Sequence, residues 1–585
     1  MATRLKETDA LVLGVGLVGT ILARELARAG LSVVGLERGE PRFTVPDFQG
    51  PAIHDELRYA VRKELFMDAA KETFTFRNRI GQAALPIRRI ESFLPGMGLG
   101  GSAVHWNGQN WRFQESDYRM RTLTAERYGA KFLPEDASVQ DWGVTAAELE
   151  PHYDRFEYLM GICGQAGNLK GTKIVGGNPF EDPRSREYPN PPLKEPYGSA
   201  RFRQAAERLG YHPFPMPSAN MSRPYTNPEG LTLNTCTFCG FCERFGCEHF
   251  AKASPQTALL PVLLEDPKFS LRTGCQVLRI NTRGGMATGA TYVDARGQEF
   301  EQPAKLVIVA LYALNNVRML LLSRIGAPYD PRKRKGVVGR NYAYQTMSGA
   351  KVFYDESVHI NPFMRSGACG TVIADFVSDN FNHGPLGFVG GGYIGETMSH
   401  GRPIEFHPVP EGTPKWGAQW KRAVARHYNH TSTLGVHASS MATWGNYLDL
   451  DPTYKDAWGQ PLLRITFDFP ENDIRMSAYL TGKAEAIARE MGGRTVEASP
   501  RKRPYTTTEY QTTHNTGGTI MGADSSTSVV NPFLQSWDAP NVFVIGASNF
   551  PQNASYNPTG PVGALAYRAA EAIVGRYLKS PGPLA

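Results

Sequence analysis

The chain has 585 residues, with a hydrophobic content of 41%, a charged content of 20% and a net charge of +7. This length exceeds what one simple core accommodates, so we expect two or more domains. The mild positive charge does not indicate a nucleic-acid surface. No run of about 18 apolar residues is free of charges, so we expect no transmembrane helix. The glycine-broken apolar run at the N-terminus is not typical of a signal peptide.

The N-terminal segment reads as strand, glycine turn, helix and strand. An apolar run at 10–13 leads into Gly14, Gly16 and Gly19, and a second apolar run ends at Glu37. In such a motif the glycines allow a tight turn, a close approach to pyrophosphate and close helix packing, and the helix N-terminus binds phosphate. The carboxylate at the strand end can accept both hydroxyls of a ribose. The segment predicts a dinucleotide site, because a ligand-free glycine turn would not need Glu37.

The C-terminal segment favours FAD over NAD as the dinucleotide. Residues 539–578 contain a strand at 542–545, the small residues Gly546 and Ala547, a polar loop and a long helix. FAD folds typically close two distant segments on one cofactor, since the flavin half needs its own backbone cradle.

These two ends and four further stretches resemble the glucose–methanol–choline (GMC) oxidoreductase family. The four stretches are 94–112, 273–280, 305–326 with 336–341, and 513–548. The resemblance implies an α/β fold, with a Rossmann-like FAD-binding domain and a second α+β substrate domain built on an antiparallel sheet. Two positions depart from the family pattern: Ala310-Leu311-Tyr312-Ala313 replaces Ala-Gly-Ala, and Gly546 replaces an acidic residue.

The resemblance also implies which residues bind FAD beyond the first glycine motif. They are Gly98, Gly100, Gly101, Ser102, His105, Trp106 and Asn107 of a second glycine-rich loop, with Val277, Gly546, Ala547 and Thr559. His105 has two interpretations. It attaches FAD covalently, as a similar His-Trp pair does in some relatives, or its ring stacks beside the flavin.

The resemblance assigns catalysis to His514 and Asn557. A base must reach the substrate hydroxyl while a hydride leaves carbon for the flavin, and histidine suits this task near neutral pH. The Asn557 amide would donate to the same oxygen and orient the alcohol. The alternatives are a histidine satisfied by packing and an asparagine that serves only the turn.

Four of the seven cysteines lie within one short segment, at Cys236, Cys239, Cys242 and Cys247. Zinc sites usually separate two cysteine pairs by a dozen or more residues, whereas ligands this close are typical of an iron–sulfur cluster wrapped by one loop. Resemblance to bacterial sugar dehydrogenases of the family implies [3Fe–4S], with Cys239 as the spare thiol. A [4Fe–4S] cluster, zinc and plain buried thiols stay open.

The predicted organisation places the FAD domain at 1–115, 235–345 and 505–585, with the substrate domain at 116–234 and 346–504. We expect a strand of the substrate sheet at 460–469 and a helix at 472–490 capped by Asn472. His400, His407 and His437 are interpreted as structural histidines.

The resemblance implies a dehydrogenase of a sugar or sugar acid, D-gluconate oxidised to 2-keto-gluconate above all. Its partners would be a small subunit and a multihaem cytochrome c subunit at the periplasmic face of the bacterial inner membrane. The alternatives are a fructose, glucose or glucoside dehydrogenase of the same design, and a peroxide-producing sugar oxidase. A further alternative is not an enzyme: an interaction subunit that a bound metal stabilises and that keeps an inactive flavin fold.

Overall fold

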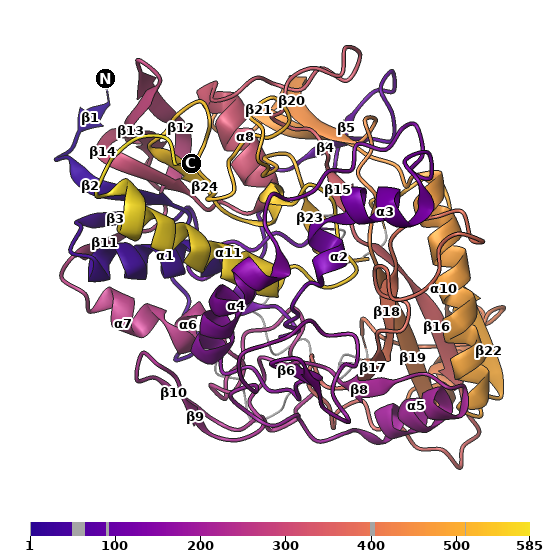
Figure 1. Cartoon of the computed structure of the whole chain (residues 1–585). Coiled ribbons are helices and arrows are strands. Elements are labelled where there is room, and N and C mark those ends of the chain that lie inside the picture. The colour runs from indigo at the N-terminus through magenta and orange to yellow at the C-terminus, as the bar shows by residue number, and fades with distance from the viewer. Residues whose placement is uncertain (1, 49–64, 89–92, 398–403, 509–510, 585) are drawn as a thin grey trace.

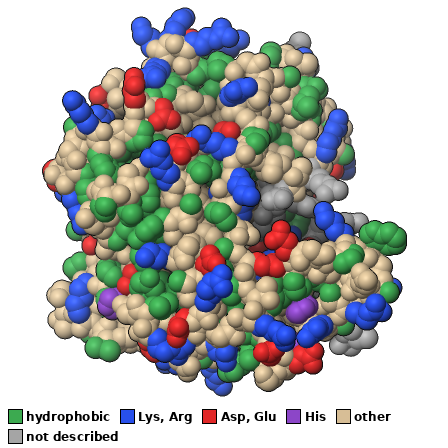
Figure 2. Space-filling model, turned by 90° about the vertical axis from the view of Figure 1, so that its right-hand side faces the viewer, with side chains coloured by type: hydrophobic (Ala, Val, Ile, Leu, Met, Phe, Trp, Pro, Cys, Tyr) green, Lys and Arg blue, Asp and Glu red, His purple; other side chains and the backbone are tan. Residues whose placement is uncertain are grey.

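The computed structural model describes residues 2–48, 65–88, 93–397, 404–508 and 511–584. Two large sheets organise these residues, one near the N-terminus and one at the opposite side of the molecule (Figure 1). Figure 2 shows basic and acidic side chains scattered over one face of the molecule. Among the described residues, no helix combines the length and the apolar character needed to cross a bilayer.

The first sheet joins both ends of the chain. Its path is β11-β3-β2-β14-β13-β12, and β1 and β24 also pair with β14. The bounds are β1 Thr3–Arg4, β2 Thr8–Leu13, β3 Val33–Leu36, β11 Phe269–Arg272, β12 Gln276–Arg283, β13 Met286–Val293, β14 Glu299–Val309 and β24 Val542–Val544. Val307 of β14 pairs in parallel with both Leu11 of β2 and Val542 of β24. The predicted strands at 10–13 and 542–545 are therefore neighbours of the same central strand.

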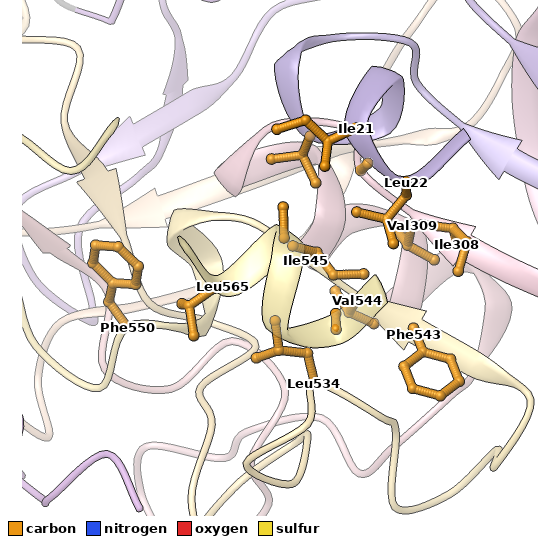
Figure 3. Close-up of a cluster of buried hydrophobic side chains, with 14 of the residues drawn as sticks. Ile21, Leu22, Ile308, Val309, Leu534, Phe543, Val544, Ile545, Phe550 and Leu565 are labelled. Carbon is orange, nitrogen blue, oxygen red and sulfur yellow. The ribbon is translucent and has the colours of Figure 1, made fainter. Parts of the chain in front are cut away.

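Helices bury the central strands and form the core of this part. The helix α1 (Leu17–Arg28) packs beside α11 (Thr559–Ala572), and α4 (Ala146–Met160) packs on α11. Ile21 and Leu22 of α1 meet Ile308 of β14 in a fully buried cluster that also contains Leu565 (Figure 3). Strands covered on both faces are apolar along their whole length, which explains the uninterrupted runs in the sequence.

The second sheet is antiparallel, as predicted. Its order is β22-β16-β19-β18-β17-β8, and the helices α10 (Glu471–Glu490) and α5 (Tyr197–Arg208) pack against it. The strand bounds are β8 Pro213–Pro215, β16 Thr346–Phe353, β17 Thr371–Ile373, β18 Gly392–Glu396, β19 Thr431–Ala438 and β22 Thr495–Ser499. The mixed α/β class with an antiparallel second sheet is confirmed. The predicted domain boundaries stay a prediction.

The strand and the helix predicted at 460–469 and 472–490 are present, but two details of these predictions were wrong. The strand is β21 (Pro461–Thr466), and it belongs to a separate four-stranded sheet with β20 (Tyr447–Lys455), β4 (Thr75–Arg77) and β5 (Leu85–Pro86). Helix α10 begins at Glu471 with Pro470 at its N-cap, so Asn472 is not the cap. The Asn472 side chain instead bonds the backbone of Val389, because tertiary packing offers it buried partners.

Candidate active site

One cavity collects most of the predicted site residues. Its volume is about 440 Å³, which lies in the range of ligand pockets in proteins. Its wall contains Gly14, Gly16, Glu37, Gly98, Gly101, Ser102, His105, Trp106, Asn107, Val277, His514, Gly546, Ala547, Asn557 and Thr559. Gly19, Gly100 and the four clustered cysteines are not in this wall.

The first glycine motif forms the predicted tight turn. Gly14 has φ of +85°, and a Cβ there would lie 2.6 Å from the carbonyl oxygen of Ala310. A Cβ on Gly19 would lie 1.9 Å from the Gly14 oxygen, so this glycine allows close helix packing rather than ligand contact. Glu37 is buried, and its two carboxylate oxygens accept from the backbone N–H groups of Val15 and Gly39, each at 3.0 Å.

The second glycine-rich loop crosses the first. The Gly100 N–H donates to the oxygen of Val15 at 2.9 Å, and a Cβ on Gly100 would lie 2.4 Å from the side chain of Gln256. A 3-10 turn over Gly101–Val104 follows. Gly100 therefore connects the two glycine loops without forming part of the cavity wall.

Unpaired buried polar atoms indicate a polar ligand in this cavity. Among the described residues, the wall includes five side chains that each have a buried nitrogen or oxygen without a hydrogen-bond partner: His105, Gln276, Asn315, His437 and Gln511. Buried polar groups are nearly always paired, so these atoms suit a ligand with many donors and acceptors. The glycine cradle and these atoms fit FAD. Sequence reasoning missed Gln276, Asn315 and Gln511, since isolated amides carry no motif.

His105 faces the cavity with an unpaired Nε2 atom. Burial, with the nearby Lys252 ammonium, lowers its pKa to about 3, so the ring is neutral. Its ring packs edge-on against Phe66, with the ring centroids 4.7 Å apart.

The structure brings His514 and Asn557 together as a pair. Asn557 Nδ2 lies 3.2 Å from His514 Nε2, and the other ring nitrogen, Nδ1, contacts Oε1 of Gln345. The Gln345 amide nitrogen faces the carbonyl oxygens of Ala554 and Tyr556, so its oxygen must face the ring. Nδ1 therefore carries the hydrogen, and the Nε2 lone pair is directed to the cavity side. Burial lowers the His514 pKa to about 3, which keeps the ring neutral.

Tyr393 and His437 extend this pair, although neither was predicted as a site residue. The Tyr393 hydroxyl lies within donating distance of two oxygens, Gln109 Oε1 at 2.6 Å and Asn557 Oδ1 at 2.9 Å. The His437 ring, interpreted from the sequence as structural, stacks on Tyr393 and lines the cavity, and its Nδ1 has no hydrogen-bond partner among the described residues. His400 lies outside the described residues. His407 is exposed, and its Nδ1 lies 3.1 Å from the Ile404 oxygen.

The four clustered cysteines share the wall of a second, small cavity of about 10 Å³. Among the described residues, however, no three side chains of His, Cys, Asp or Glu are arranged to hold a metal ion. Burial raises the thiol pKa of Cys236 and Cys242, and that of Cys239 to about 12. The four cysteines line one small space, as expected of a loop that binds a single group. Their thiols are not, however, in the positions that metal ligands would occupy.

The cysteine loop, residues 236–247, and the nearby Lys252 are hydrogen-bonded to the segment that lines the large cavity. The Arg244 N–H donates to the His105 oxygen at 2.7 Å. The buried Lys252 ammonium donates to the oxygens of Trp106, at 2.7 Å, and Cys242, at 2.8 Å. The wall of the small cavity is therefore bonded directly to the backbone of residues that line the large one.

Comparisons with known proteins agree with this geometry. Family models described as GMC oxidoreductase match residues 193–347 and 443–566. The chain is 48% identical to the gluconate 2-dehydrogenase flavoprotein of Pantoea cypripedii, over 100% of this chain and 96% of that protein. It is 24% identical to the fructose dehydrogenase large subunit of Gluconobacter japonicus, over 98% and 99% of the two chains. The solved structure of formate oxidase from Aspergillus oryzae superposes with a TM-score of 0.60 at 15% identity, over 99% and 100% of the chains.

Proposed function

We propose that this chain, which belongs to the GMC oxidoreductase family, is an FAD-dependent dehydrogenase that oxidises D-gluconate to 2-keto-gluconate. Membership makes the protein an alcohol-oxidising flavoenzyme. The observation that carries the proposal is the neutral His514 beside Asn557 in the wall of the glycine-lined cavity. The 48% identity to a gluconate 2-dehydrogenase flavoprotein supports the substrate.

The residues of the pair have separate tasks in the proposed reaction. The substrate hydroxyl would lie between His514 Nε2 and Asn557 Nδ2, where it replaces their mutual contact. His514 Nε2 takes the hydroxyl proton, while the hydrogen on Nδ1 stays there and is donated to Gln345 Oε1. The Asn557 amide donates to the same oxygen and holds the carbon–hydrogen bond in line. FAD, when bound, supplies the acceptor for the hydride that leaves that carbon.

The glycine cradle, Glu37, Val277 and Thr559 would hold the FAD. His105 would lie against the flavin, and its unpaired Nε2 supports either a covalent bond or a ring contact. A denaturing gel separates these two states, because a covalent flavin stays with the polypeptide and a bound one runs at the dye front.

We propose that the cysteine loop holds an iron–sulfur cluster, with [3Fe–4S] favoured over [4Fe–4S]. The spacing of Cys236, Cys239, Cys242 and Cys247 supports it, as does their position behind the residues that line the large cavity. Such a cluster, when bound, passes electrons singly, as a haem acceptor requires. An assay of iron and acid-labile sulfide on anaerobically purified protein tests this point, and iron-free protein that still reduces haem contradicts it.

An exposed apolar spot beside the cysteine loop suits a partner protein. The backbone of Arg365 bonds both Phe238 and Gly240 of the loop, and its neighbour Met364 is 62% exposed. We propose that a cytochrome c subunit binds there, in a complex with a small subunit at the periplasmic face of the inner membrane. The relative named as a dehydrogenase large subunit supports a multi-subunit complex.

A substrate panel with an artificial one-electron dye tests the function. Gluconate turnover without peroxide supports the proposal. Turnover of neutral sugars alone favours the fructose, glucose or glucoside alternative, which the 24% identical fructose dehydrogenase subunit supports. Rapid peroxide formation with oxygen indicates the oxidase alternative.

A further inference from the structure

His437 occupies an unusual position for a buried histidine. It comes from β19 of the antiparallel sheet, its side chain is 8% exposed, and it lines the large cavity. Its Nδ1 is buried without a hydrogen-bond partner among the described residues. A buried imidazole with an unpaired nitrogen is costly unless a ligand supplies the partner.

The orientation of the His437 ring is set by its neighbour. The ring stacks on Tyr393 with a centroid separation of 4.7 Å and an interplanar angle of 11°. Tyr393 is in turn anchored through its hydroxyl to Asn557. The ring is therefore held in place by its flat face, while its Nδ1 makes no hydrogen bond to the part of the chain that the structure describes.

His437 is also close to the catalytic pair. Its ring centroid lies 6.4 Å from that of His514, with the ring planes tilted by 42°. Two oxygens on adjacent carbons of one ligand can each accept or donate a hydrogen bond of about 2.8 Å to one of two rings at this spacing. One histidine would then serve the reacting hydroxyl and the other its neighbour.

The His437 ring is neutral in this environment, since burial lowers its pKa to about 4. Glu243 of the cysteine loop is the charged group that acts on it, and the same carboxylate acts on His514. A neutral ring offers one N–H donor and one acceptor. It can bind a hydroxyl in either role, and its N–H can donate to a carboxylate.

We propose that His437 binds the substrate, by a hydrogen bond to the oxygen-bearing group on the carbon next to the one oxidised. For a 2-hydroxy acid such as gluconate that group is the carboxylate or the neighbouring hydroxyl. The identity of the acid rests on the proposed function, whereas the role of His437 requires only a polyhydroxylated substrate in this cavity.

The test uses His437→Phe, which keeps the stack on Tyr393 but removes both nitrogens, and His437→Asn, which restores a donor and an acceptor. We expect His437→Phe to lower kcat/KM at least 30-fold, mainly through KM, with unchanged flavin content. His437→Asn should recover part of the loss. A non-oxidisable sugar-acid analogue, followed by the flavin absorbance change, should bind at least tenfold more weakly to His437→Phe.

The matched control is His383→Phe. His383 is also buried, with one unpaired ring nitrogen and a pKa lowered by burial, but it does not line the cavity. This variant should keep KM and analogue binding even where it lowers thermal stability. Equal KM and analogue affinity in His437→Phe and the unmodified enzyme would overturn the inference. If the unmodified enzyme oxidises only neutral sugars, the gluconate proposal fails, and the same variants measured on that sugar still decide the role of His437.

Discussion

The hydroxyl of Tyr393 lies 2.9 Å from the side-chain oxygen of Asn557, and a hydrogen bond between them favours the amide orientation in which Nδ2 faces His514. An amide can rotate by half a turn with little change in shape, so a partner on one end is needed to fix the other. Tyr393 acts in this way although it lies 164 residues before Asn557 in the chain.

Replacement of Tyr393 by Phe should therefore lower kcat roughly fivefold, since one hydrogen bond contributes about 1 kcal/mol. The KM should change little, and the aromatic stack on His437 is kept. Stopped-flow reduction of the flavin by substrate measures the effect. Asn557→Ala is the reference, because removal of the donor itself should cost more. An unchanged rate of flavin reduction in Tyr393→Phe would contradict the orienting role.

The pH dependence of activity should respond to Gln345. Burial holds the His514 pKa at about 3, so the base is neutral at every working pH and no acid limb arises from it near neutrality. A carboxylate beside Nδ1, in Gln345→Glu, favours the protonated ring and should raise this pKa by roughly 1–3 units. Activity would then fall as the pH is lowered through the raised pKa.

The measurement is kcat/KM against pH with an artificial dye. Gln345→Leu serves as the control, because it removes the Nδ1 contact without adding a charge. Gln345→Leu should lower kcat/KM at all pH values without moving the pH at which kcat/KM falls on the acid side. An acid limb at the same pH in Gln345→Glu and the unmodified enzyme would exclude the contact as a determinant of the base.

The cysteine loop is tested with Cys242→Ala. Cys242 is a proposed ligand of the cluster, and its thiol is buried against Ser366. Because the cluster would lose a ligand, this substitution should remove most of the iron and most of the haem reduction. Reduction of the flavin by substrate should be retained. Cys163→Ala is the matched control, since Cys163 is an equally buried thiol outside the loop. Iron and sulfide content at the unmodified level in Cys242→Ala would rule out this thiol as a ligand.

The partner surface is tested with Met364→Glu. A charge at the centre of an apolar contact should weaken binding, and we expect a roughly tenfold higher concentration of cytochrome for half-maximal haem reduction. Dye reduction should not change. Val175→Glu is the control, because Val175 is 96% exposed and lies apart from the cysteine loop in the sequence. Equal behaviour of the two variants would place the partner elsewhere.

The ion pair between Arg365 and Glu396 holds the residue whose backbone is hydrogen-bonded to the cysteine loop. Arg365 Nη1 donates to Glu396 Oε2 at 2.8 Å, and both residues are buried. Arg365→Met leaves a buried carboxylate without its cation, which should lower the free energy of unfolding by roughly 3–5 kcal/mol. Chemical denaturation of the holoenzyme measures this.

The control for that experiment is Arg494→Met, which breaks the ion pair of Arg494 with Asp355. Its two side chains are 67% and 61% exposed. Such surface pairs contribute less than about 1 kcal/mol. Comparable losses of stability in the two variants would contradict the assigned role of the buried pair.

The sequence alone determined the features that depend on local pattern. The glycine spacing at 14–19, the apolar strands beside it and the cysteine spacing at 236–247 are each contained in a short stretch, because turns and strand periodicity are local properties. The resemblance to a family then connected His514 with Asn557, and the structure brings them to 3.2 Å.

Only the tertiary structure decided which other residues complete the wall. Gln345, Tyr393 and His437 come from separate strands or loops, and no motif distinguishes them from ordinary core residues. Gln345 meets His514 across 169 residues of sequence. Their roles depend on which side chains face one cavity after two sheets have packed, and that is a property of the whole fold rather than of any segment.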